Sequence, residues 1–137
     1  LEDLIELKSH FTDEKIYKRA YHAVTEQLRT IKSKTAMENN EPQIFADLLN
    51  QSHESLKNDY EVTGFQLDSI VYSAREHGAI GARVTGAGFG GCAIALVPLK
   101  NLENFHALVG EDYFSKTGLK ASFYDVTFVN GVDSYVD

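Results

Sequence analysis

Apolar residues recur at helical spacing through the first half of the chain, over residues 1–78. The first long stretch follows Thr12, a residue type that often caps helix N-termini, and its apolar side chains fall within an arc of about 140°. The sequence therefore predicts a long amphipathic helix with this arc packed inward and a solvated face of lysines and arginines opposite. The arc consists of Ile16, Tyr17, Ala20, Tyr21, Val24, Leu28 and Ile31.

A second long helix is expected after the break formed by Asn39, Asn40 and Pro42. Its apolar stripe also includes Ser52 and His53. We interpret both as packing residues, because a small hydroxyl bonds back to its own helix and a histidine on an apolar face is usually a hydrogen-bonded core residue.

The period then changes from helical to extended. Thr63 and Gln66 have the spacing of a capping box, which predicts a helix that ends at Gly78. The runs Gly81–Thr85 and Cys92–Val97 are short and rich in strand-favouring residues. We therefore expect two strands joined by a glycine-rich loop.

The last part of the chain predicts one more helix and one more strand. Asn101 is a candidate cap for a helix that ends near Gly118, and Tyr124, Val126 and Phe128 alternate with polar residues as in a half-buried strand. Helices followed by strand, loop, strand, helix and strand indicate an α+β fold with a mainly antiparallel sheet packed against several helices.

Composition and charge narrow the class of protein. The 137 residues are 43% hydrophobic and 24% charged, as expected for one globular domain over residues 1–137. The net charge of −7 argues against nucleic acid as a partner, and the longest apolar run, Cys92–Pro98, is too short to cross a membrane. A single cysteine favours the cytoplasm. Because the chain begins at Leu1 in what reads as the middle of a helix, we expect a piece of a longer protein.

The loop Gly86–Gly91 formally matches the pattern G-x-G-x-x-G. The strand expected after it excludes a dinucleotide-binding motif, which needs a helix there. A phosphate-binding P-loop would end in Gly-Lys-Ser/Thr, and the partner motifs of protein kinases are missing from the sequence. Two interpretations remain: an anion-binding turn of backbone amides, or a tight hairpin with close backbone packing. An exposed Phe89 would pack against another lobe.

The loop and its flanks resemble a known family. Residues 81–92 look like the third conserved motif of galactokinases, members of the GHMP superfamily of small-molecule kinases. Residues 52–62 and the helix around residues 19–29 are similar to the segments that precede this motif. The likeness runs from about residue 5 to residue 129, with one departure at Ala87, where many members carry glycine.

The resemblance implies the ferredoxin-like C-terminal domain of a GHMP kinase. Galactokinases transfer the γ-phosphoryl group of ATP to the anomeric hydroxyl of galactose with Mg²⁺. Their N-terminal lobe contributes the catalytic residues and most contacts to ATP and Mg²⁺, so that lobe is the expected partner and this chain alone is expected to be inactive. The resemblance implies no catalytic residue and no metal ligand in this chain. It implies that one wall of the cleft for phosphate and sugar is formed by Thr85, Gly86, Gly88, Phe89, Gly90 and Gly91.

Other interpretations stay open at this point. The parent protein is alternatively a related GHMP sugar kinase, or a non-catalytic relative that senses sugar and ATP. Asp59, Asp68 and His53 have the chemistry of catalysts, but the pattern favours structural roles: Asp59 near a helix end and Asp68 in the first turn of the next helix.

Overall fold

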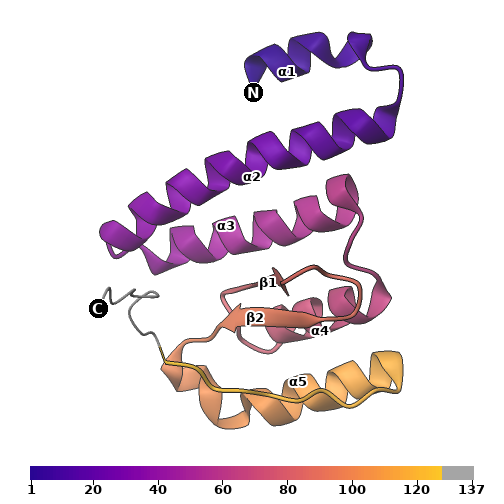
Figure 1. Ribbon diagram of the computed structural model, residues 1–137. Coiled ribbons are helices and arrows are strands. Elements are labelled where there is room, and N and C mark those ends of the chain that lie inside the picture. Colours follow the sequence, from indigo (N-terminus) through magenta and orange to yellow (C-terminus); the bar gives the residue numbers. More distant parts are fainter. Residues whose placement is uncertain (128–137) are drawn as a thin grey trace, which may run out of the picture.

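The computed structural model describes residues 1–127. In Figure 1, α2 and α3 run antiparallel on one side of the molecule, the β1–β2 hairpin and α4 lie in the middle, and α5 closes the other side. Among residues 1–127, none of the helices combines the length and apolar character that a membrane crossing requires. The elements are α1 (Glu2–Glu6), α2 (Glu14–Glu38), α3 (Pro42–Ser55), α4 (Phe65–Glu76), β1 (Gly81–Thr85), β2 (Cys92–Leu96) and α5 (Leu102–Thr117).

Helix α2 starts one residue later than predicted. Asp13, rather than Thr12, occupies the cap position, and its carboxylate accepts a hydrogen bond from the backbone N–H of Lys15 (2.8 Å). A carboxylate at this position also interacts favourably with the positive end of the helix dipole.

The face that α2 buries is not the predicted apolar arc. The exposed fractions of Ile16 and Ile31 are 58% and 55%, whereas the buried residues of the helix are His22, Thr25 and Ala36. Four other members of the arc, Tyr17, Ala20, Tyr21 and Val24, are half-buried, so within this chain the predicted arc is covered only in part. Helix α2 packs on α3 through a polar face and leaves apolar side chains exposed.

Helix α3 lies against the outer edge of β1. The side-chain amide of Asn50 donates to the carbonyl of Ile80 (3.1 Å), and its oxygen accepts from the backbone N–H of Ala82 (3.0 Å). A Cβ at Gly81 would lie 2.7 Å from the Cα of Ala46, so this contact requires glycine. The side chain of Asn50 thus pairs with backbone groups of the edge strand that would otherwise lack partners.

The predicted capping box at Thr63 is wrong. Helix α4 begins at Phe65, with Gly64 in the cap position (φ +81°) and no side-chain capping bond, while Thr63 is buried. The helix starts too late for the Thr63 hydroxyl to reach its free amides. The end of the helix near Gly78 is as predicted.

The two central strands form the predicted antiparallel hairpin. Thr85 pairs with Cys92 next to the loop, and Gly81 pairs with Leu96 at the open end. Strand β2 ends at Leu96, one residue before the predicted Val97. Helices α4 and α5 cover this hairpin, and the core between them consists of Leu67, Val71, Ala74, Ala79, Ala82, Val84, Phe105 and Val109.

The C-terminal part of the described chain runs beside α5 without forming a strand (Figure 1). Phe123 stacks on His106 (ring centroids 4.8 Å apart), whereas Tyr124 and Val126 are almost fully exposed. The half-buried strand predicted here is therefore not formed through residue 127, and its predicted member Phe128 lies outside the described residues. The fold is mostly helical with a small antiparallel sheet, and the predicted α+β class is confirmed.

Candidate functional site

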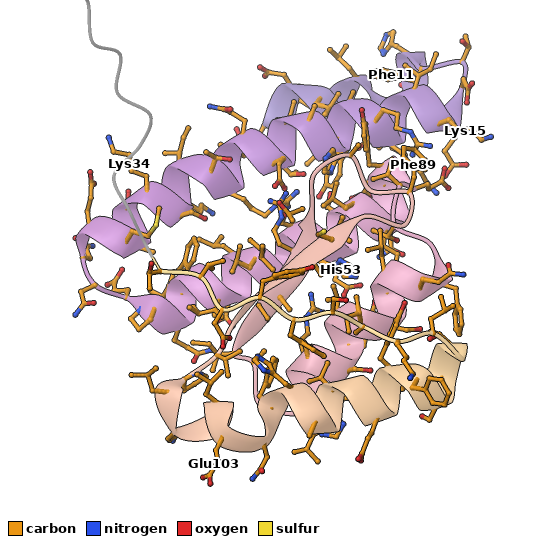
Figure 2. The ribbon with its side chains drawn as sticks, turned by 60° about the horizontal axis from the view of Figure 1, so that its bottom comes forward. Phe11, Lys15, Lys34, His53, Phe89 and Glu103 are labelled. Carbon is orange, nitrogen blue, oxygen red and sulfur yellow. The ribbon has the colours of Figure 1, made fainter. Side chains whose placement is uncertain are left out.

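The glycine loop is the exposed end of the hairpin. Residues 86–91 connect β1 directly to β2, so the loop enters a strand rather than a helix, as predicted. Phe89 lies at its tip with 79% of its surface exposed, on the side of the molecule where α2 begins (Figure 2). The loop is therefore open to a partner or ligand and is not part of the core.

The backbone of the loop uses the conformational freedom of its glycines. The φ angle is +76° at Gly86, +82° at Gly88 and +97° at Gly90. Phe89 adopts φ +54°, which is disfavoured for a residue with a Cβ. Positive φ at four of six positions turns the chain sharply and leaves short stretches of bare backbone.

Two of the loop amides are already hydrogen-bonded within the chain. The N–H of Phe89 donates to the carbonyl of Val62 (2.9 Å), and that of Gly91 donates to the carbonyl of Gly88 (3.2 Å). Within residues 1–127, no such partner is found for the amides of Gly86 and Gly90, both exposed. The donors open to a ligand are thus fewer than the sequence alone indicates.

Beneath the loop, a polar cluster joins β1 to α2 and α3. One carboxylate oxygen of Glu26 accepts from Ser52 Oγ (2.6 Å) and from Arg83 Nη1 (3.0 Å), and the other accepts from Arg29 Nε (2.8 Å). The Arg83 side chain also donates from Nε to the carbonyl of Val84 (2.8 Å). These contacts hold the end of β1 against both helices.

Glu26 is ionised in this cluster. Burial opposes the charged form, but the hydrogen bonds from Ser52 and Arg29 and the charges of Arg29 and Arg83 outweigh it and lower the pKa of Glu26 below its ordinary value. The sequence patterns predicted no site role for Glu26, Ser52 or Arg83. A signal was present, because Arg83 lies three residues before Gly86 and its alternation with Val84 places it on the opposite face of the strand.

His53 and Asp68 lie together but apart from the loop. His53 is fully buried, its Nε2 is 3.4 Å from Asp68 Oδ1, and within the described residues neither ring nitrogen makes a hydrogen bond. Asp68 also lies 3.3 Å from the ammonium of Lys57. Burial and then the charge of Arg75 lower the pKa of His53, so the ring is neutral at physiological pH. The structural interpretation of His53 and Asp68 stays a prediction.

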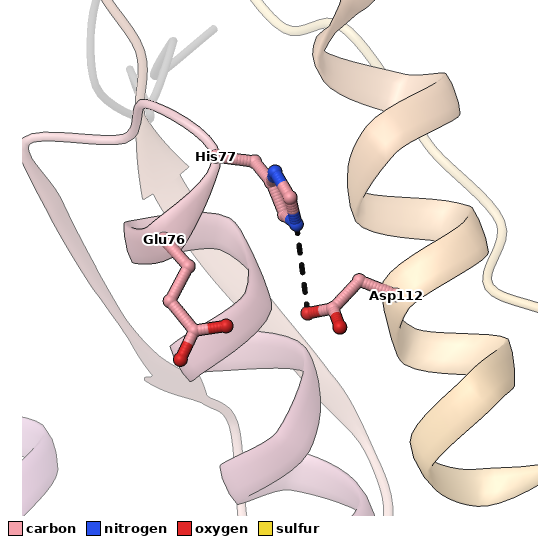
Figure 3. A group of neighbouring side chains, drawn as sticks. All are labelled: Glu76, His77 and Asp112. Carbon is pink, nitrogen blue, oxygen red and sulfur yellow. Dashed lines mark ion pairs between the residues drawn. The ribbon is translucent and has the colours of Figure 1, made fainter.

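Glu76, His77 and Asp112 form the group of metal-ligand types shown in Figure 3. His77 Nε2 is 3.7 Å from Asp112 Oδ2. The ammonium of Lys116 lies 2.6 Å from Asp112 and 2.9 Å from Glu76, and its hydrogen bond lowers the pKa of Asp112. A cation is therefore already supplied by the chain, and the group ties α4 to α5 as an ion-pair cluster.

Comparison with known proteins agrees with the geometry of the hairpin and its helices. The family described as GHMP kinases C terminal matches residues 33–113. Galactokinase from Enterococcus faecalis is 51% identical over 120 residues, and galactokinase from Clostridium beijerinckii is 46% identical over 131 residues. These alignments cover 87% and 95% of this chain but only 31% and 34% of the relatives, so the chain spans about a third of their length.

Solved structures give the same result. The crystal structure of Lactococcus lactis galactokinase complexed with galactose matches 90% of this chain and 32% of that protein, with a TM-score of 0.86 and 47% sequence identity. The crystal structure of L. major mevalonate kinase, at 24% identity and a TM-score of 0.53, shares the fold. The chain belongs to the GHMP kinase family, carries its C-terminal domain, and is similar to galactokinases along nearly its whole length.

Proposed function

We propose that this chain is the C-terminal lobe of a galactokinase, which transfers the γ-phosphoryl group of ATP to the anomeric hydroxyl of galactose. The observation that carries the proposal is the sequence identity of 51% and 47% to two galactokinases over nearly the whole chain. One of these galactokinases was crystallised with galactose. In the reaction, the anomeric oxygen bonds to the γ-phosphorus as the bond to the β-phosphate oxygen breaks. The hydroxyl proton leaves to a base that we place outside this chain.

The glycine loop is proposed to form one wall of the phosphate and sugar cleft, with the members Thr85, Gly86, Gly88, Phe89, Gly90 and Gly91. Support comes from its exposure and from the free amides of Gly86 and Gly90, which suit negatively charged phosphoryl oxygens. The Phe89 and Gly91 amides act differently, since they fix the loop to the rest of the chain and to itself. The Phe89 ring would exclude water from the cleft.

ATP and Mg²⁺ are proposed to bind mainly to a preceding N-terminal lobe. Residues 85–91 carry amide hydrogens and a hydroxyl but no carboxylate, so they fit phosphate oxygens better than Mg²⁺, which prefers carboxylates and water. Mg²⁺, when bound, would neutralise charge on the phosphates. We propose that this N-terminal lobe also packs against the exposed loop and against the exposed apolar residues on α2. The proposed location of the protein is the cytoplasm.

A phosphoryl-transfer assay of the full-length protein with ATP and a panel of sugars tests this function. Galactose is expected to be the preferred acceptor, and residues 1–137 alone are expected to give no turnover. Preference for another sugar would indicate a related GHMP kinase. Binding of galactose and ATP without turnover would indicate a sensor, and both results would overturn the proposal.

A further inference from the structure

The place of the glycine loop depends on one carbonyl group outside it. The oxygen of Val62 accepts the N–H of Phe89 (2.9 Å), and a Cβ added to Gly88 would lie 2.3 Å from the same oxygen. The loop is thus in direct contact with Val62, and any movement of this carbonyl moves the loop. What holds Val62 therefore also positions the loop amides.

The backbone before Val62 has an unusual path. Helix α3 widens into a π-helical turn at Leu56–Tyr60, and the next residue, Glu61, is left-handed with φ +60° and ψ +44°. The N–H of Val62 closes this turn on the carbonyl of Leu56 (3.1 Å). A left-handed residue with a Cβ persists where surrounding contacts hold it.

Helix α2 supplies those contacts. The guanidinium of Arg19 donates to the carboxylate of Glu61 (2.6 Å) and, through its other terminal nitrogen, to the carbonyl of Asp59. It also lies over the ring of Tyr60, 5.6 Å from the centroid. The side chain of Arg19 therefore contacts three successive residues, Asp59, Tyr60 and Glu61, and Glu61 is the residue in the left-handed conformation.

A second contact from α2 supports the same turn. The ring of His22 stacks on Tyr60 with centroids 4.7 Å apart. Ser55 Oγ donates to Asp59 Oδ2 (2.7 Å) and so accepts from His22 Nδ1 (3.0 Å). His22 and Ser55 are buried, whereas the side chains of Arg19 and Glu61 remain 34% and 46% exposed. Ion pairs this exposed contribute little to folding, so the contacts of Arg19 bear on the local geometry of the turn more than on overall stability.

We propose that Arg19 and Glu61 are positioning residues for phosphoryl transfer, which set the glycine loop through the Val62 carbonyl. The inference rests on the proposed function. Loss of the pair lets Glu61 leave the left-handed conformation, shifts Val62 and misaligns the Gly86 and Gly90 amides. Since small misplacements near the reacting atoms have large effects on rate, we expect kcat to fall on the order of tenfold, with a smaller change in KM.

The test uses the full-length protein with Arg19→Gln, Glu61→Gln, the double variant and the charge swap Arg19→Glu with Glu61→Arg. The matched control is Lys34→Gln, which breaks the exposed Lys34–Glu38 pair on the same helix. For each variant we would measure kcat, KM for galactose and ATP, thermal unfolding, and hydrogen exchange at the Phe89 amide.

The proposal predicts lower kcat and faster exchange at Phe89 in both single variants, no further loss in the double variant, partial recovery in the swap, and an unchanged control. Unchanged kcat and exchange would overturn it, and so would an equal loss of protection throughout the lobe, which would indicate a purely structural pair. Should the wild-type protein fail to phosphorylate galactose, the proposed function fails. The exchange at Phe89 would then still decide whether Arg19 and Glu61 hold the loop.

Discussion

Two interfaces meet at strand β1, and they differ in chemistry. On one side lies the apolar core formed with α4 and α5, into which Val84 points. On the other side lies a polar interface with α2 and α3, where Arg83 meets Glu26 and Ser52. Because successive strand residues point to opposite faces, adjacent residues serve the two interfaces just before the glycine loop begins.

The difference separates stability from geometry. Apolar burial is non-directional and supplies most of the free energy of folding, whereas hydrogen bonds and ion pairs contribute less net stability but define positions and angles. The apolar core therefore holds the lobe together, and the polar interface, with the Arg19–Glu61 pair at its end, sets where the loop lies.

Removing a large side chain from the apolar core should have the largest effect. Phe105 is buried in the apolar core that α4, α5 and the hairpin share, and Phe105→Ala should lower the free energy of unfolding by about 3–5 kcal/mol. Urea unfolding measures the change. Leu99→Ala, at an exposed position, serves as control and should change it by less than about 0.5 kcal/mol. Similar losses for both variants would show that the core has been misidentified.

Adding one methyl group at Gly88, where the loop contacts Val62, should have the second-largest effect on the free energy of unfolding. In Gly88→Ala the new Cβ meets the Val62 carbonyl in a left-handed conformation, and we expect a loss of about 2–3 kcal/mol together with a strong fall in kcat. Gly90→Ala has open space around its Cβ and should lose only about 1 kcal/mol, from the backbone strain. Urea unfolding and turnover of the full-length protein compare the two variants. Equal effects would rule out the close contact as the cause.

Truncating the centre of the polar interface should cost less than opening the core. Glu26→Ala removes the acceptor of Ser52 and Arg83, and we expect a loss of about 1–2 kcal/mol. Glu26→Gln keeps an acceptor oxygen and should recover part of that loss. Urea unfolding compares the two variants. If the glutamine variant were as unstable as the alanine variant, a hydrogen-bonding role of Glu26 would be contradicted.

Acidification should destabilise the folded state through buried histidines. Burial and the charge of Arg75 lower the pKa of His53 from its ordinary value of 6.5, and burial lowers that of His22 in the same direction. Below pH 6.5 the unfolded chain therefore binds more protons than the folded one. The contribution of these histidines to the free energy of unfolding is fully present above pH 6.5 and is lost as the pH decreases below it. His53→Gln should make the slope between pH 6.5 and 5 shallower in urea unfolding, and an unchanged slope would exclude His53 as a source.

Residue types at particular positions correctly predicted those elements that depend only on neighbouring residues in the chain. Gly118 ends α5 in the left-handed conformation, Pro42 starts α3, and the hairpin follows from two strand-forming runs around a glycine-rich turn. The capping box at Thr63 failed because Gly64 takes the cap position. The apolar arc on α2 is only partly covered, because helical periodicity identifies an apolar face but not what packs against it.

The same limit applies to the candidate site. The glycine pattern was sufficient to predict an exposed turn between two strands, and three of its four glycines have positive φ angles. Which amides stay free depends on Val62, a residue that lies 27 positions before Phe89 in the chain and has no distinguishing side chain. Arg19 and Glu61, 42 positions apart, form a pair that no local pattern indicates.

The amino-acid sequence by itself therefore determined the helices, the hairpin, the flexible backbone of its loop and the family that the chain resembles. These depend on residue type and spacing over a few positions. The tertiary structure alone decided that α2 packs through its polar face, that Val62 anchors the loop and that Arg19 holds the turn before it. Such contacts join distant segments, and their geometry follows from how whole helices pack around β1.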